Sequence, residues 1–96
     1  MEDLSRKLQR VLVGMGYAPD TVPHDVSHGI EHLLRLLAPE DEEVIVHYYG
    51  LFGEERLSLA ELAAARRMSE EDMMARIDAC VRRIAVTPEW EMLKGS

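Results

Sequence analysis

Three histidines recur at every fourth position in the first half of the chain, at His24, His28 and His32. Residues four apart on a helix lie on one face, and imidazole nitrogens at that spacing can chelate a transition-metal ion. The chain has no cysteine beside these residues and no spacing typical of a structural zinc site. We therefore expect a polar helix face and no resident metal; a metal shared between two chains of a dimer is the alternative.

The sequence holds one cysteine, Cys80, which cannot form an internal disulfide. Its neighbours at helical spacing, Ile77, Val81 and Ile84, predict that the thiol packs in the core as a small apolar group. There is no glycine-rich phosphate loop, no serine–histidine–aspartate arrangement tied to a turn and no carboxylate pair with a plausible pocket. We therefore predict no catalytic residues and no cofactor, and we do not expect an enzyme.

Acidic residues gather at two expected helix starts in the middle of the chain. The net charge is −7, and residues 40–74 alone carry three bases and ten acids, whereas residues 1–39 and 75–96 sum to −1 and +1. The acids run from Glu40 to Glu43 and from Glu70 to Asp72. A helix dipole favours carboxylates at both places. A segment this acidic also suits a basic protein partner better than DNA, which is itself a polyanion.

Apolar residues spaced three and four apart predict helices along the whole chain. Two serines are expected to begin helices as N-caps, Ser58 in a capping box with Glu61, and Ser69 in the same arrangement. A final helix is expected to begin with Thr87 as its N-cap and Pro88 at the first helical position. The predicted helices span residues 5–15, about 25–37, 39–49, 57–66, about 70–85 and 88 onward.

No alternating run of β-branched residues is long enough for a sheet, so the sequence predicts an all-α protein. We expect a small helical bundle of about six short helices that contains a helix-turn-helix around one core. Residues 1–37 would form an N-terminal extension of two helices and residues 38–96 the helix-turn-helix domain, together one compact unit.

The location of the protein is also predicted from composition. No apolar run approaches the roughly 20 residues that a membrane span needs, and the acidic N-terminus lacks the cationic start of a signal peptide. A single cysteine is typical of a reducing compartment. We therefore expect a cytoplasmic protein that does not interact with a membrane.

One stretch of the chain combines several short patterns in a fixed order: Glu43-Val44-Ile45, Tyr49-Gly50-Leu51, Leu57-Ser58-Leu59-Ala60-Glu61-Leu62-Ala63, Ser69-Glu70-Glu71 and Val81-Arg82-Arg83-Ile84. Their order and spacing resemble region 4 of the bacterial sigma-70-type sigma factors. That family has a helix ending in Tyr/Phe-Gly-Leu, a Thr/Ser-Leu-x-Glu-Ile-Ala helix, a turn, and a recognition helix ending in Leu-Arg-Lys-Leu. The resemblance covers about half of the chain.

The resemblance implies a domain that docks on the flap of the polymerase β subunit and places the second helix of its helix-turn-helix in the major groove of promoter DNA. This recognition-helix surface would lie at Glu70, Glu71, Asp72, Met74 and Ala75. The family commonly has arginine, lysine or glutamine at several of these positions. A carboxylate only accepts hydrogen bonds and repels phosphates, so it cannot offer guanine a pair of donors. Met74 is expected on the exposed face, where a methionine suits an adaptable protein-binding surface.

Five arginines remain as candidates for phosphate or partner contacts: Arg66, Arg67, Arg76, Arg82 and Arg83. Arg76 matches a position where related extracytoplasmic-function sigma factors often carry arginine. Arg82 and Arg83 fall in the last turn of the predicted helix, where the dipole favours cations. Solvated charges at helix ends are therefore the alternative explanation.

The sequence thus predicts a sigma-region-4-like, transcription-associated module that acts mainly through protein contacts. Its partner would be RNA polymerase, a sigma factor or an anti-sigma factor, and the acidic recognition helix would leave only weak nucleic-acid binding. One alternative is a dimeric helix-turn-helix regulator that binds DNA. The other is a structural or oligomeric domain with a metal at the histidine stripe.

Overall fold

The computed structural model describes the backbone of residues 3–95 and the side chains of residues 5–95. Met1, Glu2 and Ser96, which the predicted segments include, lie outside the described residues. The described residues form α-helices and one short 3-10 helix but no strand, which confirms the all-α prediction. The elements are α1 (Asp3–Tyr17), η1 (Pro19–Thr21), α2 (His24–Leu34), α3 (Pro39–Tyr49), α4 (Leu59–Ala65), α5 (Glu70–Ala85) and α6 (Pro88–Lys94).

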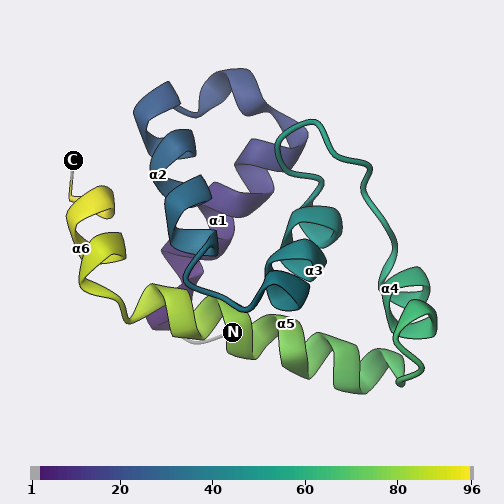
Figure 1. Cartoon of the computed structure of the whole chain (residues 1–96). Helices are drawn as coiled ribbons and strands as arrows, with labels where there is room; N and C mark the ends of the chain where they lie inside the picture. The colour runs from purple at the N-terminus through teal and green to yellow at the C-terminus, as the bar shows by residue number, and fades with distance from the viewer. Residues whose placement is uncertain (1–2, 96) are drawn as a thin grey trace.

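Helix α5 is the longest helix and runs along one side of the fold (Figure 1). Helices α1, α3, α4 and α6 all pack against it, and α2 packs on α6. The side of α5 that faces them carries Met73, Ile77, Val81 and Ile84 at helical spacing, all buried as predicted. Helix α6 adds Trp90, whose side chain is buried in the same core.

Helix α1 continues through Gly14 and Gly16 to Tyr17, so the predicted end of this helix at residue 15 was wrong. The structure gives Gly16 a different role. A Cβ atom at this position would collide with the carbonyl oxygen of Tyr49, at the end of α3. The glycine therefore allows α1 and α3 to approach closely, and packing of the helix overrides the low helical propensity of glycine.

Helix α2 ends at Leu34, earlier than the predicted end at Leu37. The N–H groups of Leu36 and Leu37 donate to the carbonyls of Leu33 and Leu34, so the chain tightens into successive turns here. Leu37 is nevertheless buried. The apolar pattern extended the predicted helix to Leu37 because the turns, like a helix, direct this side chain into the core.

Helix α3 ends at Tyr49, and the residue that caps it, Gly50, adopts the left-handed conformation with φ of +67°. The loop that follows returns to α3, since the N–H of Leu57 donates to the carbonyl of His47. Helix α4 then begins with the predicted capping box. The hydroxyl of Ser58 accepts from the N–H of Glu61 and the carboxylate of Glu61 accepts from the N–H of Ser58, each at 3.1 Å. Helix α4 begins at residue 59, and not at 57 as predicted, because the serine is its cap.

A short turn, residues 66–69, joins α4 to α5, and the two helices pack against each other. A helix-turn-helix consists of two helices joined by such a turn, which often contains glycine. Here Arg67 holds the left-handed position, with φ of +55°. Ser69 then caps α5 as predicted, because its hydroxyl accepts from the N–H of Asp72 at 3.0 Å. The local cap chemistry therefore sets where α5 begins.

Candidate functional site

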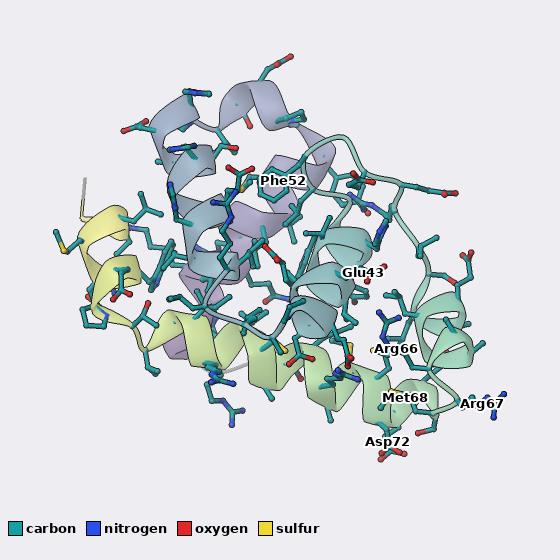
Figure 2. All side chains as sticks on the ribbon, viewed as in Figure 1. Glu43, Phe52, Arg66, Arg67, Met68 and Asp72 are labelled. Carbon is teal, nitrogen blue, oxygen red and sulfur yellow. The ribbon has the colours of Figure 1, made fainter. Side chains whose placement is uncertain are left out.

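The surface expected to read DNA lies at the exposed start of α5. Glu70, Glu71 and Asp72 occupy its first turn, and all three side chains are exposed. Figure 2 shows Asp72 pointing away from the body of the molecule. Ala75, one turn further along, is exposed as well. The open end of α5 thus presents carboxylates and a methyl group.

Met74 does not belong to this exposed surface, so the prediction that it faces solvent was wrong. Its side chain is half-buried and packs against the core. The hydroxyl of Tyr48, on α3, lies 3.8 Å from the sulfur of Met74. The helical count on α5 alone could not reveal this, because the cover comes from α3.

Arg76 is paired with acids from α3. Its Nε lies 2.7 Å from Oδ1 of Asp41, and its Nη2 lies 4.0 Å from Oε2 of Glu40. The Asp41 side chain is 22% exposed and that of Arg76 is 31% exposed, so the shorter contact is partly shielded from water. This pair ties the start of α3 to the middle of α5 and engages the Nε of an arginine that was expected to be available for phosphate.

The acids at the start of α3 contact this arginine, and the acids at the start of α5 precede it on its own helix. Asp72 precedes Arg76 by four residues, so both lie on one side of α5. Glu40 and Asp41 reach the same arginine from α3. We use the name acidic face for the exposed first turn of α5 together with the neighbouring α3 acids and the arginine that they pair with; its members are Glu40, Asp41, Glu70, Glu71, Asp72 and Arg76. Sequence reasoning missed the pairing because no local pattern links residues that are 35 positions apart.

The remaining arginines do not converge on this face. Arg66 ends α4 and is half-buried, whereas Arg67 is exposed and points outward from the turn in Figure 2. Arg82 and Arg83 are exposed in the last turn of α5. Since a helix rises about 1.5 Å per residue, about 18 Å along α5 separates this pair from the first turn. One chain therefore does not gather these arginines into a single basic patch.

Cys80 lies in the core, as predicted, and is 6% exposed. Burial raises the pKa of its thiol, and the nearby charge of Asp41 adds to this effect. A raised pKa favours the neutral thiol, which is a poor nucleophile.

The three histidines of α2 are all exposed along one side of the helix. The structure brings His28 and His32 together, with their Nε2 atoms 3.3 Å apart. The ring of His24 stacks on that of His28 at a greater separation, 6.3 Å between centroids. Among the described residues, no group of three or more His, Cys, Asp or Glu side chains is placed to hold one metal ion.

An apolar hollow between α2 and α6 was not predicted. Its volume is about 580 Å³, and Leu36 and Met92 at its edge are 48% and 77% exposed. The sequence did contain a signal for this hollow. Four leucines lie within residues 33–37, and one face of a helix cannot bury all of them. In the part of the chain described here, no helix has the length and apolar character to cross a bilayer.

Comparison of the chain with protein-family models, with curated proteins and with solved structures found no match. The interpretation of the acidic face therefore depends on the geometry and on the resemblance drawn from the sequence.

Proposed function

We propose that this chain is a transcription-associated module, similar to sigma region 4, that acts through protein contacts. The acidic face would bind a basic surface of RNA polymerase, of a sigma factor or of an anti-sigma factor. The helix-turn-helix body would provide the rigid support for this face. Reading of DNA would be weak.

The observation that carries this proposal is the chemistry of the exposed start of α5. Glu70, Glu71 and Asp72 stand where the resemblance expects donors to bases and phosphates. Interaction with the helix dipole stabilises an acidic side chain in the first turn by about 0.3–1 kcal/mol, and so accounts for carboxylates at a single helix start. It does not explain why Arg76, one turn further along the same helix, is itself paired with Asp41. The result is a surface that repels phosphates and attracts basic side chains.

Binding through this face would be electrostatically steered. Exposed carboxylates at an interface mainly raise the association rate and select the partner, and salt screens both effects. Interaction with a basic partner should therefore weaken as the salt concentration rises. The half-buried Arg76 pair is screened less, so it should hold α3 and α5 in place under the same conditions.

The direct test is co-purification of the tagged chain with core RNA polymerase, sigma factors and anti-sigma factors from its own cells. The variant Glu70→Gln/Glu71→Gln/Asp72→Asn should lower recovery of the partner by about 10-fold, since each exposed pair contributes about 0.5 kcal/mol. The matched control is Glu54→Gln/Glu55→Gln/Glu89→Gln, which removes the same charge from exposed positions elsewhere. Equal recovery with both variants, or no polymerase subunit and no sigma regulator with the parent, would refute the proposal.

A gel-shift assay with promoter DNA separates this proposal from the DNA-binding alternative. We expect only a weak complex at low salt, where phosphate contacts are strongest, and none that depends on the promoter sequence. A shift with steep salt dependence, lost in Arg82→Gln/Arg83→Gln, would instead favour a dimeric regulator. Two copies of the chain could bring those distant arginines together, which one copy does not.

A further inference from the structure

Helix α2 places two imidazole nitrogens against each other on an exposed surface. Nε2 of His28 lies 3.3 Å from Nε2 of His32. The two rings are nearly perpendicular, with centroids 4.7 Å apart and an interplanar angle of 88°. The two Nε2 atoms are thus within hydrogen-bond distance, so one ring can donate its N–H to the other.

We propose that His28 and His32 form a bidentate site for a late divalent transition-metal ion. Imidazole nitrogen binds Zn²⁺ at about 2.0–2.1 Å. Two nitrogens separated by 3.3 Å and each about 2.1 Å from one ion subtend an angle of about 104° at that ion. This value is close to the tetrahedral angle, so the separation of the two nitrogens fits one ion, which would replace the proton that the two rings share.

A carboxylate lies near the other nitrogen of the His28 ring, beyond hydrogen-bond distance. Oε1 of Glu31 lies 3.8 Å from Nδ1 of His28, and Nη2 of Arg35 lies at the same distance from that oxygen. A ligating histidine usually directs its other N–H group toward a carboxylate or a carbonyl. With the proton on Nδ1, the lone pair of Nε2 is left for the metal.

The donor set indicates which ions would bind. Imidazole suits Cu²⁺, Ni²⁺ and Zn²⁺, whereas Mg²⁺ and Ca²⁺ prefer oxygen ligands. Affinity should follow the usual order for nitrogen sites, with Cu²⁺ above Ni²⁺ and Zn²⁺. Two protein ligands leave the remaining positions to water, so the site would be an accessory metal site on α2. It does not depend on the acidic face, which belongs to α3 and α5.

The test is calorimetric titration of the full chain with Cu²⁺, Ni²⁺ and Zn²⁺ in a buffer that does not bind metals. We expect one ion per His28–His32 pair. Removing an outer partner of a metal ligand typically costs about 10- to 100-fold in affinity, so His28→Ala or His32→Ala, which removes a ligand, should cost at least about 10-fold. The matched control is His24→Ala, an exposed histidine of the same helix, which should leave the affinity unchanged.

Two further readouts separate ligation from a structural effect. Electron paramagnetic resonance of bound Cu²⁺ should show two nitrogen ligands in the parent and one in either single variant. Zn²⁺ should raise the melting temperature of the parent and of His24→Ala, and not that of His28→Ala/His32→Ala, because a ligand that binds the folded state stabilises it. Absence of heat with all three ions, or an equal loss in His24→Ala, would overturn the proposal.

Discussion

Burial changes the acid–base chemistry of one phenol in the core. Tyr49, the last residue of α3, is 5% exposed. Burial, together with the charges of Tyr48 and Asp78, raises its pKa from 10.0 to about 12. The folded state thus retains the phenolic proton at pH values where the unfolded state loses it. The stability linked to Tyr49 is fully present below pH 10 and is lost as the pH rises toward 12.

Alkaline titration of stability tests this shift at the level of one residue. Between its unfolded and folded pKa, Tyr49 should lower the free energy of unfolding by up to about 1.4 kcal/mol per pH unit. Tyr49→Phe should reduce this slope, as measured by urea denaturation at a series of alkaline pH values. Tyr17→Phe, which alters a ring that is 74% exposed, should retain it. An unchanged slope in Tyr49→Phe would show that the phenol is not the group responsible.

Single-residue predictions succeeded where the helix's own spacing decided the environment. Cys80 and Ile77 are buried as their positions on α5 require. Met74 and Arg76 could not be placed in the same way, because α3 covers one and pairs with the other. Knowing that a segment is helical gives the direction of each side chain, but the partner comes from another element.

At the scale of the elements, the crossing of α1 and α3 depends on a glycine. Gly16 lies against the backbone of Tyr49, and the carbonyl oxygen of Tyr49 also accepts a hydrogen bond from Nη2 of Arg56 at 2.9 Å. A side chain at Gly16 would have to displace backbone, which is less adaptable than another side chain. Gly14, on the same helix, has more room: a Cβ there would meet Cγ2 of Val22 at 3.6 Å, an ordinary contact.

The two glycines therefore predict opposite effects of the same substitution. Gly16→Ala should lower the free energy of unfolding by about 2 kcal/mol, because overpacking typically costs about 1–3 kcal/mol. Gly14→Ala should raise it by about 0.5–1 kcal/mol through better helical propensity. Urea denaturation of the two variants and the parent measures both. A stabilising Gly16→Ala would mean that α1 and α3 do not approach closely there.

Helix starts were easier to predict than helix ends. Helices α4, α5 and α6 begin after Ser58, Ser69 and Thr87, as their caps indicated. A cap is a hydrogen bond between residues three apart, so the local sequence contains it. The ends of α1 and α2 depend on packing against distant helices. The acidic face combines both cases. Each acidic run could be predicted from the local sequence, whereas the pairing of the α3 acids with Arg76 on α5 could not.

At the scale of the whole molecule, the first two helices contribute to the same core as the helix-turn-helix. Helix α1 packs on α3 and α5, and α2 packs on α6. Apolar side chains from the first 37 residues belong to the buried cluster, namely Leu8, Leu12, Met15, Ile30, Leu33, Leu34 and Leu37. Burying each such side chain contributes about 1.5–3 kcal/mol. Together they are comparable with the entire stability of a small domain, about 5–15 kcal/mol.

Residues 38–96 alone should therefore not fold cooperatively. Without residues 1–37, the side of α5 that α1 covers would be exposed to solvent, and α6 would lose its packing against α2. Far-ultraviolet circular dichroism should show reduced helicity and no sharp thermal transition. A cooperative transition near that of the full chain would show that the segment is an independent domain.

The placement of one aromatic residue has a practical consequence for studying the protein. Trp90 is the only tryptophan in the sequence, is 1% exposed and belongs to α6. Its fluorescence will therefore report on whether the last helix is docked, while remaining remote from the first turn of α5. A partner that engages the acidic face should leave the emission wavelength unchanged. A red shift on complex formation would reveal that binding at one end of the molecule loosens the other.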